Sequence, residues 1–332
     1  MWHHEAGQIE RCDECRFDGS AYTDLDAGNT VRKLSAWAGE LMLGVPPESL
    51  ARRPTPTTWS PAEYLRHVKR MVWSMALLAE TVLTEPGVAV EGSPPVDAAA
   101  DDPAPEIDAA HELVRLHEES MRLFDLWTRC SDDRRDATIF VNGEAADLGG
   151  IVRHAAHDGS HHLSDIGRGI AALGYGSSGR GEVAFVHASN GGVPKRTLGR
   201  AVVGYRGIVG DRQDDRRNHG RVWQALCLWS TEVIDGLRSE GHPVAPGTAG
   251  ENLTLSGIDW SALRPGTRLD FADGGPLVET TMWAAPCKTI AESFTERDFR
   301  RIDAVRQPGS ARLYAKVLRD GVVRPGQAFT LS

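Results

Sequence analysis

Four of the twelve histidines of the chain lie within ten residues, in the stretch HAAHDGSHHL at 154–163. On a helix, His157 and His161 are four residues apart and project both imidazoles to one side, as a metal clamp requires. His162 points about a quarter-turn away from them. His67, in an earlier helical segment, is the candidate for a third ligand. The alternative interpretation is an unusually polar helix turn that binds no metal.

Three neutral imidazoles around one cation would define the chemistry available at this cluster. They leave at least one coordination position open, which is typical of catalytic rather than structural metal sites. Imidazole suits several divalent metals, so the ligand types do not identify the ion. Zinc is the expectation because of its availability, with nickel, iron or manganese as alternatives.

A second group of reactive residue types lies in the C-terminal half of the chain. Cys287 directly follows Pro286 at an expected strand end, and its thiol becomes a nucleophile if nearby cations lower its pKa. The Asp- and Arg-rich loop at 212–221 supplies such cations, and its guanidinium groups can bind an anion. The alternatives are a solvated charged loop and a small, buried, apolar cysteine.

Near the N-terminus, Cys12 and Cys15 form a lone C-x-x-C pair. The pair is half of a zinc knuckle, but no second cysteine pair follows it. A redox role is the alternative, although no thioredoxin-like βαβ pattern surrounds the pair. We therefore expect a structural role or no specific role.

The composition argues against several classes of function. The 332 residues suffice for two domains, and 41% hydrophobic with 25% charged residues is typical of soluble globular proteins. A net charge of −9 argues against a general nucleic-acid binder or a protein of anionic membranes. No apolar run reaches the ~20 residues that span a bilayer, and the first residues lack a signal-peptide core. Because the five cysteines are an odd, scattered set, we expect reduced thiols and a cytoplasmic protein.

The elements that must position the histidines are helices. Apolar residues recur three and four positions apart in four segments, so we expect an antiparallel four-helix bundle. Ser60, Pro61 and Glu63 form a strong start signal, with Ser60 as the N-cap and Glu63 completing a capping box. A Pro-, Ala- and Asp-rich loop is expected at 84–106. The four expected helices lie at 30–45, 58–83, 107–130 and 147–174.

The pattern changes at the Gly- and Ser-rich stretch 174–182, which is typical of a linker. Short runs with β-strand character follow, separated by Gly, Pro and Asp turns. They predict a compact β-rich barrel rather than βαβ units, with two short helices near 231–240 and 295–303.

Two stretches of the N-terminal half, WSPAEYLRHV and HDGSHHLSDIGRGI, resemble the DinB-like bundle family over about residues 10–175. That family includes mycothiol-dependent isomerases and other thiol-dependent transferases. The resemblance implies a divalent metal held by His67, His157 and His161, with His154 and His162 beside the site or on the surface. It also implies that the metal binds a sulfur atom and holds it as thiolate at neutral pH.

The C-terminal half resembles the MOSC domain, named for the C-terminal domain of molybdenum-cofactor sulfurases. The motifs GGVPK, GDRQ…HG, PGTAGENLT, an isolated PC and YAKVLRDGVVRPGQ occur in order within about residues 180–332. The resemblance implies a β-barrel with a few small helices. It further implies either sulfur carriage on Cys287 or binding of a molybdopterin-type cofactor, and pyridoxal phosphate is a further ligand associated with the family. The implied pocket residues are Asp211, Arg212, His219, Glu251 and Asn252.

The sequence therefore predicts a multidomain α and β protein. We expect a DinB-like four-helix bundle at 10–175, a linker at 176–181 and a MOSC barrel at 182–332. The leading hypothesis is a sulfur-transferring enzyme that acts on a small-molecule thiol, with a cysteine desulfurase or another sulfur-donor protein as partner. The alternatives are a molybdenum-cofactor component of reductive detoxification of N-hydroxylated compounds and a non-enzymatic carrier. A homodimer is a further expectation, and neither nucleic acid nor a membrane is an expected partner.

Overall fold

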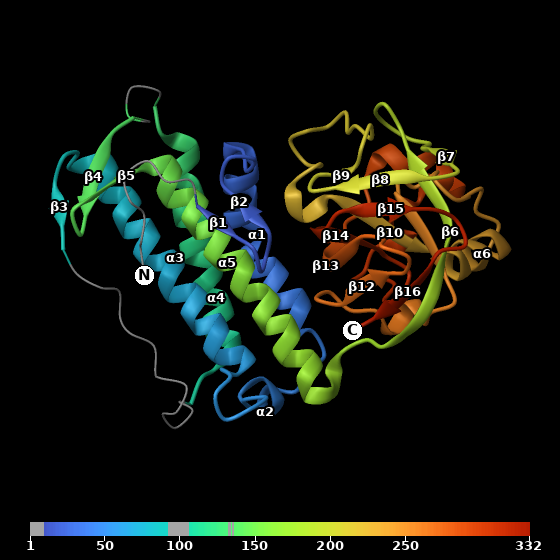
Figure 1. Cartoon of the computed structure of the whole chain (residues 1–332), viewed down its shortest axis with the longest axis horizontal. Helices are drawn as coiled ribbons and strands as arrows, with labels where there is room; N and C mark the ends of the chain where they lie inside the picture. Colours follow the sequence, from blue (N-terminus) through green and yellow to red (C-terminus); the bar gives the residue numbers. More distant parts are fainter. Residues whose placement is uncertain (1–9, 92–105, 132–133, 135) are drawn as a thin grey trace. The chain divides into compact units, whose positions relative to one another are not determined.

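The computed structural model of the protein describes residues 10–91, 106–131, 134 and 136–332. The chain divides into two compact units, Met1–Tyr175 and Gly176–Ser332, which are described separately (Figure 1). The first unit is mainly helical and the second is built on a β-barrel. Among the described residues, no helix is both long and apolar enough to cross a lipid bilayer.

Four long helices and one short helix, α2 (Pro47–Leu50), form the N-terminal unit. Helices α4 and α5 each pack against both α1 and α3, so the four long helices enclose one apolar core. Each predicted helical segment overlaps one of them, which confirms the predicted bundle. The long helices are α1 (Asp24–Met42), α3 (Pro61–Thr84), α4 (Ala109–Arg129) and α5 (Leu148–Ile170).

The predicted start of α3 is confirmed in detail. The Ser60 Oγ accepts a hydrogen bond from the Glu63 amide at 3.2 Å, and the Glu63 carboxylate accepts one from the Ser60 amide at 2.8 Å. Arg53 donates to the same carboxylate from a neighbouring loop, with its Nε 2.9 Å from the Glu63 Oε2. These contacts satisfy N–H groups that the first helical turn leaves unpaired and fix the register of the helix that carries His67.

Short strands complete the helical unit. A hairpin of β1 (Arg11–Cys12) and β2 (Phe17–Asp18) precedes α1. Within the segment 84–106, predicted as a loop, two residues instead form a strand, and residues 92–105 lie outside the described residues. The strands β3 (Ala89–Val90), β4 (Thr138–Val141) and β5 (Glu144–Asp147) form a three-stranded sheet.

Helix α5 carries the histidine cluster, and the residues at its two ends explain where it begins and where it stops. Asp147 caps its start, because the carboxylate accepts a hydrogen bond from the Gly150 amide at 2.6 Å. A π-helical turn, Ala171–Tyr175, continues from its end, and Gly174 there has a φ of 93°, which a residue with a Cβ rarely adopts. Strand β6 begins at Gly179, so the last part of the range 176–181 is strand rather than linker.

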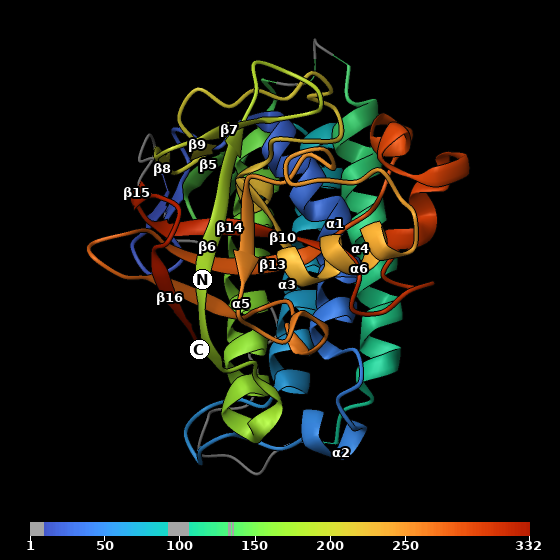
Figure 2. The same cartoon turned by 90° about the vertical axis from the view of Figure 1, so that its right-hand side faces the viewer.

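Seven strands of the C-terminal unit form a closed ring in the order β11-β10-β14-β13-β12-β16-β6, because β6 also pairs with β11. The predicted barrel is thereby confirmed, and Figure 2 shows β6 beside β16. Strand β7 (Arg196–Leu198) extends the sheet from β6. The ring strands are β6 (Gly179–Ala188), β10 (Leu226–Ser230), β11 (Leu253–Ser256), β12 (Arg268–Phe271), β13 (Leu277–Ala284), β14 (Arg312–Arg319) and β16 (Ala328–Leu331).

Smaller elements surround the barrel. A second sheet has the order β15-β8-β9, formed by Gly321–Val323, Ala201–Gly204 and Gly207–Ile208. Helix α6 (Thr231–Ser239) lies where a short helix was predicted. The second short helix, predicted near 295–303, is instead two 3₁₀ turns, Thr295–Arg297 and Phe299–Ile302.

Candidate functional sites

The histidine cluster of α5 divides into two main groups of possible metal ligands. His67 of α3 groups with Asp158 and His162, whereas His157 and His161 group with a cysteine pair of the N-terminal hairpin, Cys12 and Cys15. Within each group, one ligand atom of every residue lies within 4.8 Å of the others. A third group, which shares one residue with each of the other two, consists of His161, His162 and Asp165.

The predicted trio of His67, His157 and His161 is therefore not one group in the structure. The physical reason is that the residues facing His67 lie one position further along α5 than predicted. Each step along an α-helix turns the side chain by about 100°, so Asp158 and His162 face α3, where His67 lies. His157 and His161 face the N-terminal hairpin instead.

The group of His67, Asp158 and His162 has the geometry of a small metal site. The His67 Nε2 lies 3.6 Å from the Asp158 Oδ2, and the His162 Nε2 lies 3.5 Å from the Asp158 Oδ1. The two imidazole rings are edge-on, with their centroids 4.7 Å apart. Two imidazoles and one carboxylate form the facial set that binds non-haem iron, and a similar set binds catalytic zinc. This donor set fits a divalent cation and leaves coordination positions open.

The interactions within this group favour an ionised Asp158 and a protonated His162. Burial by itself would raise the pKa of Asp158, but hydrogen bonds from His162 and His67 hold it far below its ordinary value. Burial by itself would lower the pKa of His162, but Asp158 and Asp165 raise it to about 9. The site therefore has an ionised carboxylate that attracts cations, and a bound metal would replace the proton of the imidazole.

Neighbouring side chains fix the orientation of both imidazoles. The Nδ1 of His162 lies 2.8 Å from the Asp165 Oδ2, which leaves Nε2 directed at the rest of the group. Metal-bound histidines commonly donate their second N–H to a carboxylate in this way. Tyr64 stacks on His162 and Trp59 packs against His67, with centroid distances of 5.6 and 5.5 Å.

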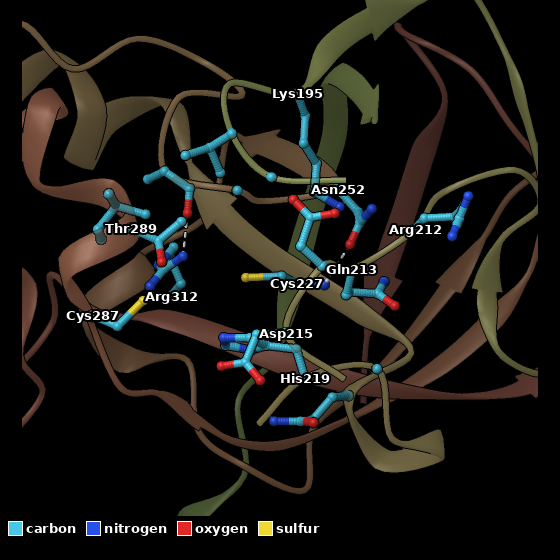
Figure 3. Close-up of a pocket in the computed structure, with 18 of the residues that line it drawn as sticks. Lys195, Arg212, Gln213, Asp215, His219, Cys227, Asn252, Cys287, Thr289 and Arg312 are labelled. Atoms are coloured by element: carbon cyan, nitrogen blue, oxygen red, sulfur yellow. Dashed lines mark hydrogen bonds between the residues drawn. The ribbon is translucent and has the colours of Figure 1, made fainter. Parts of the chain in front are cut away.

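The second candidate site lies in the barrel unit, in a pocket with an empty volume of ≈ 820 Å³ including its open mouth. Of the six residues predicted for it, four line the pocket directly: Arg212, His219, Asn252 and Cys287 (Figure 3). The two other predicted residues, Asp211 and Glu251, stand behind the lining and hold it in place.

Cys287 is the reactive group of this pocket. Its thiol is partly exposed and accepts a hydrogen bond from His219, whose Nδ1 lies 3.3 Å from the hydroxyl of Tyr314. The hydrogen bond from His219 is the largest cause that lowers the pKa of Cys287 to about 6, and Thr289 contributes through its side chain and its amide. At neutral pH the cysteine is therefore mainly a thiolate, which is the nucleophilic form.

A second cysteine lines the same pocket and has the opposite character. Cys227 is buried on β10, and burial raises its pKa to about 11. Its amide donates to the Asn252 Oδ1 at 3.1 Å. In Figure 3 the Cys227 side chain points toward the part of the pocket where Cys287 lies. At neutral pH only one of the two cysteines is in the reactive form.

The predicted acidic residues organise the polar wall of the pocket. The Asp211 side chain is buried, and its carboxylate accepts hydrogen bonds from Lys195 at 2.5 Å, from Asn252 at 3.0 Å and from the Ser189 amide at 2.8 Å. Glu251 is fully buried and accepts a hydrogen bond from the Gly247 amide at 2.5 Å, which fixes the turn beside the pocket. These carboxylates position the lining and do not themselves line the cavity.

Sequence reasoning missed several lining residues. Arg312 is buried, and its Nε has no hydrogen-bond partner among the described residues. Because Arg312 lines the pocket, its guanidinium can donate a hydrogen bond to an anionic ligand there. Lys195 is the last residue of the GGVPK motif, Tyr314 is the first residue of the YAKVLRDGVVRPGQ motif, and Arg312 lies two residues before it. These lining residues could therefore have been predicted from the motifs.

The cysteines that group with His157 and His161 were also missed as metal ligands. Their pattern could have indicated the group, because C-x₂-C and H-x₃-H are both zinc-ligand spacings.

Comparisons with known proteins agree with this division. A model of the DinB superfamily matches residues 32–166, and a model of the MOSC domain matches residues 215–330. No curated protein matches the chain. Among solved structures, YuaD from Bacillus subtilis is 18% identical, with 47% of this chain and 97% of its own covered, at a TM-score of 0.38.

Two further solved structures each match 46% of this chain. YiiM from Geobacillus stearothermophilus is 22% identical, covering 46% of this chain and 75% of its own, with a TM-score of 0.36. YfiT from Bacillus subtilis, which has a four-helix bundle topology, is 13% identical, covering 46% of this chain and 87% of its own, with a TM-score of 0.39. The two family matches support a metal-binding protein connected with sulfur or molybdenum-cofactor chemistry. The chain joins a domain of the DinB superfamily to a MOSC domain.

Proposed function

We propose that this protein is a sulfur-transferring enzyme that carries sulfane sulfur on Cys287 as a persulfide. The observation that carries the proposal is the state of this thiol, which is partly exposed, lies in a pocket lined by charged side chains of both signs and has a pKa lowered to about 6. A thiolate at neutral pH is the form that attacks a sulfur atom. The low pKa also makes Cys287 a good leaving group in the reverse direction.

The transfer conserves atoms and electrons. The Cys287 thiolate attacks the terminal sulfur of a persulfide donor R–S–SH, a new S–S bond forms, and the donor S–S bond breaks with release of the thiolate R–S⁻. A second thiolate then attacks the terminal sulfur of the Cys287 persulfide, takes it up, and regenerates the Cys287 thiolate. Arg312 lines the pocket with a buried Nε that has no partner among the described residues, and it favours anionic donors or acceptors. No net oxidation or reduction occurs in either step.

The helical unit would supply the acceptor. We assign a divalent metal to His67, Asp158 and His162 in place of the predicted three-histidine set, because these three share one group. A cation held there would stabilise the thiolate of a low-molecular-weight thiol, for which mycothiol is the family precedent. Asp165 holds the His162 ring in position for that role. Zinc remains the first expectation, and iron suits the same two-histidine, one-carboxylate set.

Sulfur transfer from a low-molecular-weight persulfide to a thiol tests this function. The Cys287→Ser variant of the full chain should fall to the rate without protein, and the Cys130→Ser variant should keep the wild-type rate, because Cys130 lines no part of the pocket. The paired His67→Ala and His162→Ala replacements should raise the KM for the acceptor thiol. Equal rates for Cys287→Ser and the wild type would contradict the proposal. Multiple turnovers without another protein would distinguish an enzyme from a carrier.

One observation favours a second candidate, binding of a molybdopterin-type cofactor in the same pocket. Arg312 offers a buried Nε without a partner among the described residues, and Arg212 is an exposed guanidinium at the pocket wall. Guanidinium groups bind phosphate well. In this case the purified protein should contain stoichiometric molybdenum, and Arg312→Met should release it. Molybdenum-free protein with full sulfur transfer would exclude this candidate.

A further inference from the structure

We propose that Cys12, Cys15, His157 and His161 form a second metal site, a structural zinc site that fastens the N-terminal hairpin to α5. The four residues lie in one group, with one ligand atom of each within 4.8 Å of all the others. Two thiolates and two imidazoles form a complete tetrahedral set, which is typical of structural zinc. The inference is independent of the proposed function, since it uses none of the ligands assigned there.

The spacings agree with zinc coordination. The cysteines are separated by two residues and the histidines by three, as in known Cys₂His₂ sites. With Zn–S bonds of about 2.3 Å and Zn–N bonds of about 2.0–2.1 Å, sulfur and nitrogen ligands of a tetrahedral ion lie about 3.6 Å apart. The Cys12 Sγ lies 3.7 Å from the His161 Nδ1. Little rearrangement is needed for a metal ion to enter between these atoms.

The orientation of His157 gives a second, independent observation. Its Nδ1 contacts the carboxylate of Glu10, which also lies 3.1 Å from the His154 Nδ1. Its other nitrogen, Nε2, is buried and makes no hydrogen bond of ordinary geometry among the described residues, while the imidazole interacts with the Cys15 thiol. A carboxylate on one ring nitrogen, with the second nitrogen left for the metal, is the arrangement of metal-binding histidines.

The hairpin is shaped to present both thiols. Cys12 ends β1, and Cys15 lies in the turn before β2, where Arg16 adopts a φ of 61°. The amides of Glu14 and Cys15 donate hydrogen bonds to the Cys12 sulfur and fix its position in the turn. Phe17 of β2 stacks on the His157 ring with centroids 4.4 Å apart, so the hairpin already contacts the helix at this point.

The role that follows is structural. The described hairpin has only two backbone-paired residues in each strand, and an isolated hairpin of this length is not stable in water. A four-ligand ion with no open position would hold this segment against α5 and contribute to folding directly. It would also hold His161 beside His162, one of the ligands proposed for the other site.

Metal content of the full chain tests the proposal. Protein produced in zinc-supplemented medium should lose one zinc equivalent in the Cys12→Ser/Cys15→Ser variant, whereas Cys130→Ser, a matched cysteine outside every ligand group, should lose none. The His67→Ala/His162→Ala variant should keep the thiolate-bound zinc even if it loses the other metal. Failure of the proposed function therefore leaves this result unaffected, and unchanged zinc in the double cysteine variant would overturn the inference.

Two measurements on wild-type protein avoid the risk that a variant misfolds. Cobalt substituted for zinc should show the visible bands of tetrahedral coordination and a thiolate-to-cobalt charge-transfer band. Alkylation followed by peptide mass spectrometry should find Cys12 and Cys15 protected until a chelator is added. A cobalt spectrum without thiolate bands, alkylation of both thiols in metal-loaded protein, or a Cys12–Cys15 disulfide in reduced preparations would each overturn the inference.

Discussion

Replacing His219 with glutamine removes the side chain that contributes most to the low pKa of Cys287. His219 hydrogen-bonds to the thiolate and also stabilises it by its charge, and Thr289 supplies the remaining favourable hydrogen bonds. Burial acts in the opposite direction and raises the pKa. Because the largest favourable contribution disappears, we expect the pKa of Cys287 in His219→Gln to rise from about 6 towards the ordinary value of 9.0.

The size of the kinetic effect follows from two opposing factors. At pH 7, a thiol with a pKa of about 6 is about 90% thiolate, and one with a pKa of about 9 is about 1% thiolate. The more basic thiolate is the stronger nucleophile, by roughly 15- to 30-fold for a Brønsted slope of about 0.4–0.5. The wild type should therefore react roughly 3- to 6-fold faster at pH 7 and roughly 15- to 30-fold more slowly above about pH 10. The two profiles should cross between about pH 7 and 8.

The assay is thiol–disulfide exchange with a neutral disulfide, followed between pH 4 and 11, with the modified Cys287 peptide quantified by mass spectrometry. His242→Gln is the control, because this histidine belongs to the same unit but does not line the pocket. Cys227 should remain unmodified at pH 7, since burial raises its pKa to about 11. A wild-type inflection near pH 9, or identical profiles for the wild type and His219→Gln, would refute the reasoning.

Three further predictions concern the helical unit. Asp165→Asn should weaken metal binding at His162 about 10- to 100-fold in a competition titration, since the carboxylate orients the ring, and unchanged affinity would argue against that role. Ser60→Ala should lower the free energy of unfolding by about 1 kcal/mol in denaturant titrations, because the capping bond at the start of α3 is lost, and an unchanged midpoint would show that the cap is dispensable. Gly159→Val should destabilise by about 1–3 kcal/mol, because an added Cβ would lie 2.7 Å from a methyl carbon of the fully buried Leu34, and a variant as stable as the wild type would show that Leu34 can move aside.

The architecture of the helical unit could be predicted because its signals are local. The Ser60, Pro61 and Glu63 combination fixes the start of α3 through bonds within four residues. The start of α1 was predicted at residue 30 but lies at Asp24, where Thr23 and Asp26 form a second capping box. That box precedes the apolar repeat, so apolar spacing alone placed the boundary too late.

The ligand sets depended on a rotation that spacing alone cannot fix. Both His157 with His161 and Asp158 with His162 are pairs four residues apart, and either pair could face His67. Packing of α5 against α3 selects the second pair. The other pair, His157 and His161, then faces the N-terminal hairpin, which is more than 140 residues away in sequence. Contacts over such a separation leave no periodic trace in a single sequence.

In the barrel unit, the motifs identified the pocket but not the depth of each residue. Asp211 and Glu251 were expected in the pocket, yet they lie behind its wall and act through Lys195, Asn252 and the Gly247 turn. Polar residues in loops look alike in sequence whether they line a cavity or support it. Whether such a residue lines the cavity or supports it depends on how deeply its side chain is buried. That depth is set only when the barrel closes, so it cannot be predicted from the local sequence.

Mapping the position of transferred sulfur tests the central claim most directly. The full chain is incubated with a low-molecular-weight persulfide at pH 7, acid-quenched, digested and measured by peptide mass spectrometry. The predicted result is one added sulfur atom on Cys287, removable by a reducing thiol, with Cys227 unmodified. An unmodified Cys287 beside a fully consumed donor, or added sulfur on Cys227 alone, would contradict the account.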